Sequence, residues 1–190
     1  MAPDIYDTAE LKKMGIHIGR NARIHKTALF FGNNITIGDN VRIDCHAVIS
    51  ANAPVILGNH IHLCAGVYIF GSAGVAIDDY CNLAPRCSIF TESDDYTDGY
   101  MTNPMIPDDF RKVHAGRVHL KKHVIIGCGS VVLPRVTLYE GASVGALSLV
   151  NRDVEAYSVV AGTPIHEVGK RDSQRLSKIE KAFRAWQDER

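Results

Sequence analysis

Branched aliphatic side chains recur at every sixth position in the second half of this chain. The register is kept by Leu120, Ile126, Val132, Leu138, Val144 and Val150. A period of six fits neither an α-helix, with about 3.6 residues per turn, nor a flat strand, with a period of about two. The pattern therefore indicates an internal repeat, and this repeat predicts the fold.

The same register runs through the first half of the chain in sets of three, with one or two extra residues after each set. The sets are Ile18, Ile24 and Phe30; Ile37, Ile43 and Ile49; Leu57, Leu63 and Ile69; and Ile77, Leu83 and Ile89. Three hexads close one coil with three short flat sides, and each aliphatic then stacks on its equivalents in the coils above and below. Six sets predict about six coils of a triangular parallel β-prism, whose core forms only by stacking.

The polar and small positions fit the same geometry. The fifth residue of the hexad also points inward and is mostly small, at Ala22, Ala28, Val41, Ala47, Ala53, Cys81, Cys87, Ser130 and Ala142. Gly, Asn or Asp follows the aliphatic at most corners, as in residues 38–40 and 58–59. These residue types tolerate the left-handed backbone that a tight corner needs.

Two helices are predicted at the ends of the repeat. In residues 7–14, Asp7 can cap a short helix, Glu10 follows three residues later and Gly15 ends it. A second helix is predicted over residues 171–190, with one apolar face formed by Leu176, Ile179, Phe183 and Trp186. We expect it to cover the open end of the prism or to pack on a neighbouring subunit. The expected division is a β-helix domain over 1–170 and this helix over 171–190.

The hexads stop between Ile89 and Leu120. We expect residues 92–117 to leave the prism as a loop. Long loops inside a compact repeat are uncommon unless they carry function, so we expect this loop to be functional.

The motifs near the C-terminus point to one family. They are Ile126-Gly127-Cys128-Gly129-Ser130-Val131, the run from Val144 to Asp153, and Ala161-Gly162-Thr163-Pro164. Over residues 16–170 the chain resembles the hexapeptide-repeat acyltransferases, in particular the sugar O- and N-acetyltransferases related to galactoside and maltose acetyltransferase. The resemblance implies an all-β, left-handed parallel β-helix, acetyl-CoA as co-substrate without a metal, and a homotrimer in which the loop lines the neighbouring subunit's site.

The amino-acid composition limits the classes of binding partner that this chain can have. The 190 residues suit one domain, and 21 basic residues balance 21 acidic ones, so nothing favours nucleic acid or an anionic membrane. No apolar run is long enough to span a membrane, and the first residues do not resemble a signal peptide. Five cysteines with no paired spacing predict a cytoplasmic protein with reduced thiols, in which Cys81 and Cys87 are inward fillers.

The predicted catalytic residues are Asp94 and His62. In the galactoside and maltose enzymes a histidine ends the hexad that opens the loop, whereas Asp94 holds that place here. Asp94 is the base if its surroundings raise its pKa. The base is otherwise a histidine from elsewhere, either His62 on a corner one coil earlier or His114. A third possibility is an amine acceptor that needs no protein base.

The loop also indicates the acceptor. Its acidic residues, including Glu92 and Asp95, suit a cationic amino sugar, Arg111 with its neighbouring lysine suits a diphosphate, and Tyr96 can stack on a sugar or base. A polar surface loop with no ligand explains the same residues. Glu92, Asp95, Tyr96 and Arg111 are the predicted substrate-binding residues.

The resemblance also implies residues that bind coenzyme A. Cys128 and Ala146 occupy third places of their hexads, where the family contacts the pantetheine arm. Asn151 and Arg152 fall near the nucleotide end, and basic residues after Gly162-Thr163-Pro164 approach the phosphates. These basic residues are His166, Lys170 and Arg171.

We therefore expect an acetyl-CoA-dependent acetyltransferase that acts on the amino group of a nucleotide-linked sugar in surface polysaccharide synthesis. A sugar O-acetyltransferase is the nearest alternative. A zinc carbonic anhydrase of the same fold is a rival because of His114, His119 and His123 and the pair His60 and His62. A non-catalytic scaffold is the third possibility.

Overall fold

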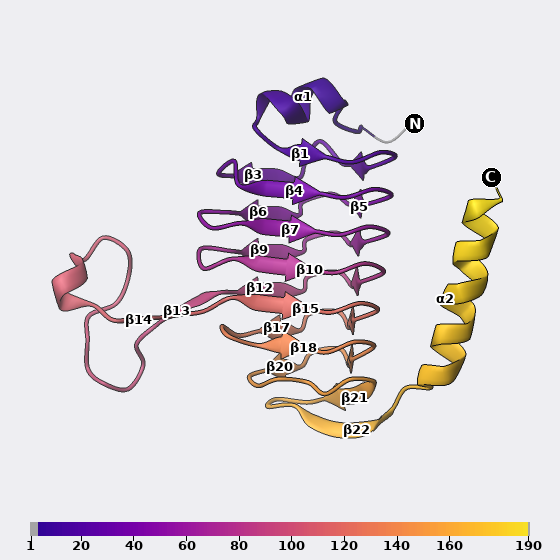
Figure 1. Ribbon diagram of the computed structural model, residues 1–190. Coiled ribbons are helices and arrows are strands. Elements are labelled where there is room, and N and C mark those ends of the chain that lie inside the picture. Colours follow the sequence, from indigo (N-terminus) through magenta and orange to yellow (C-terminus); the bar gives the residue numbers. More distant parts are fainter. Residues whose placement is uncertain (1–3, 190) are drawn as a thin grey trace.

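The computed structural model describes residues 4–189, which form a triangular prism of stacked coils with a helix over its first coil (Figure 1). Residues 1–3 and Arg190 lie outside the described residues. The prediction that the chain does not begin with a signal peptide falls partly on residues 1–3, and the predicted end of the last helix falls on Arg190. Each coil contributes a short strand to each of three sheets, which we call face 1, face 2 and face 3 in chain order.

The three faces contain these strands. Face 1 consists of β1 (His17–Ile18), β4 (Ile35–Ile37), β7 (Val55–Leu57), β10 (Val75–Ile77), β15 (Val118–Leu120) and β18 (Thr137–Leu138). Face 2 consists of β2 (Arg23–Ile24), β5 (Arg42–Ile43), β8 (His62–Leu63), β11 (Asn82–Leu83), β16 (Ile125–Ile126), β19 (Ser143–Val144), β21 (Ser158–Ala161) and β22 (His166–Lys170). Face 3 consists of β3 (Leu29–Phe31), β6 (Val48–Ser50), β9 (Tyr68–Phe70), β12 (Ser88–Phe90), β17 (Val131–Val132) and β20 (Leu149–Val150).

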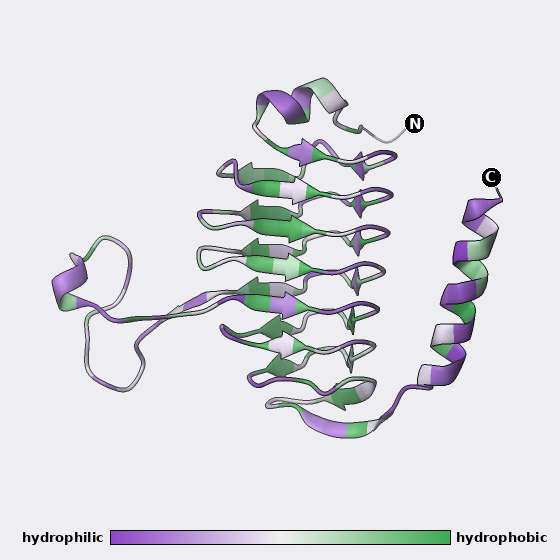
Figure 2. Ribbon diagram, in the orientation of Figure 1, coloured by the Kyte–Doolittle hydropathy of each residue, from purple (hydrophilic) through white to green (hydrophobic). Residues whose placement is uncertain are grey.

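The strands of a face pair in parallel, and their register stacks the sixth-position aliphatics. On face 2, Ile43 is opposite Leu63, Leu63 is opposite Leu83, and Leu83 is opposite Ile126. These side chains are buried, and Figure 2 shows the hydrophobic colour concentrated on the strands of the prism. The all-β, left-handed parallel β-helix is thereby confirmed, with six full coils and the start of a seventh in β21.

The small inward positions include two thiols that serve as fillers. Cys81 and Cys87 are buried, and each thiol donates to backbone carbonyl oxygens of the next coil, that of Lys121 for Cys81 and that of Gly127 for Cys87. Burial raises the pKa of Cys81 to about 12 and that of Cys87 to about 11. Both thiols therefore stay protonated at neutral pH, as the filler role requires.

The corners are named by the faces that they join, and corner 1–2 shows which residues turn the chain. Asn40, His60, Tyr80 and His123 stack there in successive coils with φ between 55° and 64°. Gly, Asn or Asp was expected to adopt this left-handed backbone; Asn40 does, whereas His60, Tyr80 and His123 take this position in the next three coils. Gly127 has a different role, which is to let two coils approach each other. A Cβ at this position would lie 2.5 Å from the backbone nitrogen of Ala146 in the next coil.

The two helices have different roles. Helix α1 (Thr8–Lys13) has the predicted capping box with Asp7 and lies over the first coil. Helix α2 (Ser173–Asp188) runs along the side of its own prism instead of covering the open end, where β22 folds back antiparallel on β21 (Figure 1). No helix in the described part of the chain is long and apolar enough to cross a membrane.

Aromatic and ionic contacts explain the position of α2. The ring of Phe183 meets those of His60 and Tyr80 edge-on, with centroids 5.3 and 6.1 Å away. His123 Nε2 lies 2.8 Å from the carboxylate of Glu180. The corner rings thus form an aromatic column that Phe183 of α2 contacts, while Ile179 and Trp186 of the predicted apolar face are 57% and 50% exposed.

Candidate active site

The loop predicted between the fourth and fifth coils is a two-stranded ribbon that extends away from the prism (Figure 1). Its strands β13 (Glu92–Asp94) and β14 (Val113–Ala115) pair antiparallel, and a short 3₁₀ helix η1 (Asp108–Phe110) lies in the excursion. Thr91 fixes the point of departure: its buried hydroxyl donates to the carbonyl of Phe70 and accepts from the N–H of Ala73, both at 2.9 Å.

Asp95 holds the turn beyond β13 together. Its side chain is 1% exposed, and its carboxylate accepts backbone N–H groups of Thr97, Asp98 and Tyr100 at 2.9–3.4 Å. His114 Nε2 lies 3.6 Å from the same carboxylate. Burial acts to raise the pKa of Asp95, but the backbone donors and His114 outweigh it and lower the pKa. The carboxylate predicted to bind substrate is therefore committed to the loop itself.

Neutralising Asp95 should loosen the ribbon. In Asp95→Asn we expect hydrogen exchange over residues 96–112 to accelerate roughly tenfold or more, because bonds to a charged acceptor are stronger than those to a neutral one. In the native protein the folded pKa is the lower one. The protection is therefore fully present above the unfolded value of about 3.9, and is lost as pH falls through the folded value.

Exchange mass spectrometry across a pH series measures this effect. Asp109→Asn, which changes an exposed carboxylate of η1, is the matched control and should leave the exchange unchanged. Equal protection in native protein and Asp95→Asn at neutral pH would show that Asp95 does not anchor the loop.

Asp94 is the partly buried acidic residue of β13 that has no strong partner within the described residues. It lies opposite Val113, is half-buried, and accepts only one long hydrogen bond, 3.4 Å from the N–H of Asn103. Asp98 is by contrast paired with Lys112 at 2.6 Å, and Asp108 with Arg111 at 2.6 Å. Asp94 can therefore accept a proton or hold an ammonium group without losing a strong partner.

The other predicted acceptor residues are spread along the excursion. Glu92 and Arg111 line one hollow of about 330 Å³, together with Asp108, Val113 and Ala115. Tyr96 is 90% exposed and extends into solvent. The structure thus brings Glu92 and Arg111 together, while Tyr96 stands apart from them.

His62 lies in strand β8 on face 2, not on a corner, and it belongs to a hydrogen-bonded chain of side chains. Its Nε2 is 2.8 Å from Asp44 Oδ2, and its Nδ1 is 3.5 Å from the Sγ of Cys64. Arg42 Nε donates to Asp44 Oδ1 at 2.7 Å. Burial acts to raise the pKa of Asp44, but the bonds from His62 and Arg42 lower it.

This cluster is separated from Asp94 within one chain. Cys64 follows β8 at corner 2–3, whereas the ribbon leaves the prism at corner 3–1, across face 3. Asp44 and Cys64 were not predicted as site residues. The hexad register contained a signal for them, because it places Arg42 beside His62 and therefore Asp44 in the column of Cys64.

The predicted coenzyme A residues are spread over face 2 and three corners. Cys128 and Ala146 are neighbours on corner 2–3, where Leu147 N–H bonds the carbonyl of Cys128 at 2.9 Å, and the ring of His166 lies close to Gly162 nearby. Exposed Asn151 and Arg152 follow β20 at corner 3–1.

The two basic residues that follow His166 have internal partners. Lys170 Nζ lies 2.8 Å from Glu167 and 2.9 Å from Ser158 Oγ on face 2. Arg171 donates to the carbonyl of His123 at corner 1–2, at 2.7 Å. Of the predicted coenzyme A residues, Cys128, Ala146 and His166 therefore lie close enough together to contact one elongated ligand.

The histidines of the zinc interpretation have separate partners. His114 faces Asp95, His119 lies 2.9 Å from Asp78, and His123 pairs with Glu180 on α2. Within residues 4–189, one group of three His, Cys or acidic side chains has ligand atoms within 4.8 Å of one another: Asp44, His62 and Cys64.

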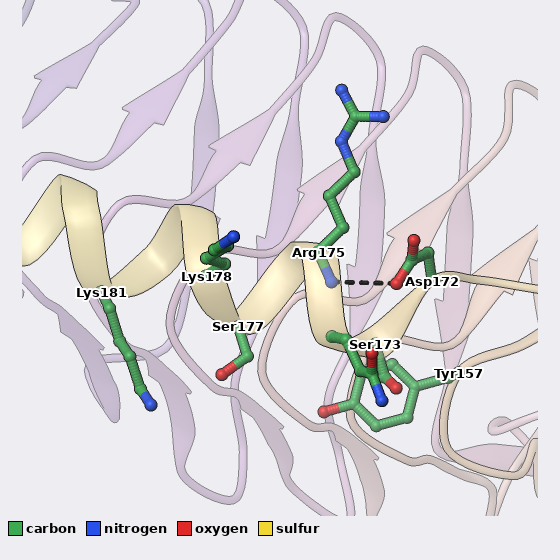
Figure 3. A pocket seen from close by; sticks show the side chains of 8 residues that line it. Tyr157, Asp172, Ser173, Arg175, Ser177, Lys178 and Lys181 are labelled. Atoms are coloured by element: carbon green, nitrogen blue, oxygen red, sulfur yellow. Dashed lines mark hydrogen bonds between the residues drawn. The ribbon is translucent and has the colours of Figure 1, made fainter.

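A hollow of about 780 Å³ lies beside α2, next to Arg171 (Figure 3). It is lined by Tyr157, Asp172, Ser173, Gln174, Arg175, Ser177, Lys178 and Lys181. Asp172 caps the helix by accepting the N–H of Arg175 at 2.9 Å, so the helix N-terminus is already occupied. The hollow contains none of the predicted site residues.

Comparison with known proteins gives relatives over nearly the whole length, although no protein-family model matches the chain. It is 43% identical to dTDP-4-amino-4,6-dideoxy-D-glucose acyltransferase of Escherichia coli, over 94% of each chain. It is 28% identical to the putative lipopolysaccharide biosynthesis O-acetyl transferase WbbJ of Escherichia coli K12, over 74% of this chain and 70% of WbbJ. The structure of AntD, an N-acyltransferase from Bacillus cereus in complex with dTDP and 3-hydroxybutyryl-CoA, superposes with a TM-score of 0.93, with 32% identity over 98% of this chain and 99% of AntD.

Proposed function

This chain belongs to the hexapeptide-repeat acyltransferases, a family of CoA-dependent enzymes, and from that membership we propose that it transfers an acetyl group from acetyl-CoA to the amino group of a nucleotide-linked amino sugar. The observation that carries the proposal is the similarity, end to end, to an acyltransferase for a dTDP-linked 4-amino sugar. The available carboxylate of Asp94 on an acidic ribbon agrees with a cationic acceptor.

The proposed reaction is direct transfer in a ternary complex. The sugar ammonium gives one proton to Asp94, and the free amine attacks the thioester carbonyl. The tetrahedral intermediate collapses with release of the coenzyme A thiolate, which takes up the second proton of the nitrogen. Backbone N–H groups along corner 2–3, near Cys128 and Ala146, are the proposed contacts of the pantetheine arm.

The assembly that we propose is a homotrimer. Face 3 is apolar on its outer side, where Phe31, Tyr68 and Phe70 are 56%, 38% and 40% exposed. The rings of Tyr68 and Phe70 stack with centroids 6.3 Å apart, and Phe90 continues the stack at 5.2 Å. An apolar patch of this kind on a folded chain marks an interaction surface. A second copy is the proposed occupant, and it brings one subunit's ribbon to the site of another.

The proposed setting is the cytoplasm, where acetyl-CoA and nucleotide sugars are available, and the product would enter a surface polysaccharide. Similarity to the putative lipopolysaccharide biosynthesis transferase WbbJ supports the proposed use of the product in a surface polysaccharide.

Calorimetric titration with acetyl-CoA, followed by an assay of thiol release, tests the function. We expect one saturable site per chain, and release of thiol with dTDP-4-amino-4,6-dideoxyglucose but not with its 4-hydroxy counterpart. Thiol release from 3-hydroxybutyryl-CoA but not from acetyl-CoA would show that the acyl group is different, and would leave the rest of the proposed function unchanged. Absence of binding at millimolar acetyl-CoA and 3-hydroxybutyryl-CoA would refute the proposal.

A further inference from the structure

Two neighbouring coils place three different metal-ligand types together where face 2 meets corner 2–3. Asp44 comes from the second coil, and His62 and Cys64 come from the third, next to it in the sheet. All three are partly buried, and one ligand atom from each lies within 4.8 Å of the others. The parallel register itself brings the groups together, so the cluster is built into the rigid part of the fold.

We propose that Asp44, His62 and Cys64 form a binding site for a divalent transition-metal ion of the zinc type. Carboxylate oxygen, imidazole nitrogen and thiolate sulfur are together the donor set that zinc favours, and three protein ligands leave a fourth position open. Binding displaces the proton of the Cys64 thiol to solvent, and the imidazole binds the ion through a ring nitrogen that carries no proton.

Arg42 determines how Asp44 takes part. Its Nε donates to Oδ1 at 2.7 Å, while Oδ2 faces His62 at 2.8 Å. Asp44 therefore offers one oxygen to the ion, and Arg42 orients the carboxylate through the other oxygen, as partners of metal-binding carboxylates commonly do.

His62 is both a ligand of the proposed ion and the second candidate base. His62 cannot take a proton from an acceptor while its ring is bound to a metal, so occupancy withdraws His62 from acid–base chemistry. Asp94 lies across face 3 and is unaffected within the same chain.

The test uses the full-length protein freed of metal with a chelator and titrated with cobalt(II) chloride, which reports thiolate ligation by a charge-transfer band in the near ultraviolet. We expect one equivalent per chain, the charge-transfer band, visible bands of tetrahedral intensity, and displacement by zinc. Saturating zinc should also raise the thermal unfolding midpoint, because it binds the folded chain preferentially.

Variants locate the site. Cys64→Ser should abolish the charge-transfer band, and Cys64→Ser and His62→Gln should each weaken binding by roughly a hundredfold or more. His119→Gln removes another partly buried imidazole that pairs with an aspartate, on face 1, and is the matched control, with binding unchanged. Absence of the band, or equal binding in native protein and Cys64→Ser, would leave only a hydrogen-bonded chain and overturn the proposal. Because binding is measured without substrates, this result is independent of whether the acyltransferase assay succeeds.

Discussion

Asp94→Asn is expected to lower kcat by roughly 10²–10⁴-fold, the usual cost of losing a general acid–base group. The physical reason is that Asp94 is the ribbon carboxylate with only one long hydrogen bond, so its basic oxygens are free to meet the acceptor ammonium. Asparagine keeps the size and the bond from Asn103 but removes the negative charge and the proton-accepting oxygen. Steady-state kinetics with acetyl-CoA and the amino sugar, over a range of pH, measures the effect.

Two controls separate chemistry from loop order. Asp109→Asn changes an exposed carboxylate in η1 and should retain activity, whereas the exchange pattern of residues 96–112 should be unchanged in Asp94→Asn. If Asp94→Asn keeps more than about a tenth of native turnover, Asp94 is not the general base. His62→Gln then decides between the second candidate base and a reaction in which the acceptor amine needs no protein base.

Phe70→Glu is expected to dissociate the trimer and to abolish activity with it. Phe70 lies in the middle of the exposed aromatic stack on face 3, between Tyr68 and Phe90. Burying such a side chain contributes roughly 1.5–3 kcal/mol, and a buried carboxylate without a partner adds a further cost at each of three interfaces. Sedimentation analysis of native and variant protein, with kinetics on the same samples, measures the effect.

Ile56→Glu is the matched control for this prediction. Ile56 lies in β7 of the same coil, is 44% exposed and belongs to face 1. We expect Ile56→Glu to remain trimeric and active. A native protein that sediments as a monomer, or a trimeric Phe70→Glu, would show that face 3 is not the subunit interface.

The period of six predicted the fold because only a coil with three flat sides places each of those aliphatics inside. Leu63, Leu83 and Ile126 stack as the hexads required, and the capping box at Asp7 formed as predicted. These features depend on local spacing, which a sequence contains directly. The position of α2 could not be predicted from its own sequence pattern, because Phe183 packs on the ring column of His60, Tyr80 and His123, which forms only when coils stack.

The candidate site, like the fold, was predicted in part from the sequence and decided in part by the tertiary structure. The sequence predicted Asp94 and His62 as catalytic residues and the loop that leaves the prism, and it separated Asp94 from Asp95 only by the hexad place of Asp94. The folded ribbon distinguishes them, because Asp95 collects three backbone N–H groups and Asp94 one long bond. The chain by itself thus determined the prism, its coil count and the place of the interruption, through a repeat that has one way to bury its aliphatics. Tertiary structure decided which carboxylate is bound up in the turn of the ribbon and where α2 lies, because those outcomes depend on contacts that form only when the ribbon and the coils are folded.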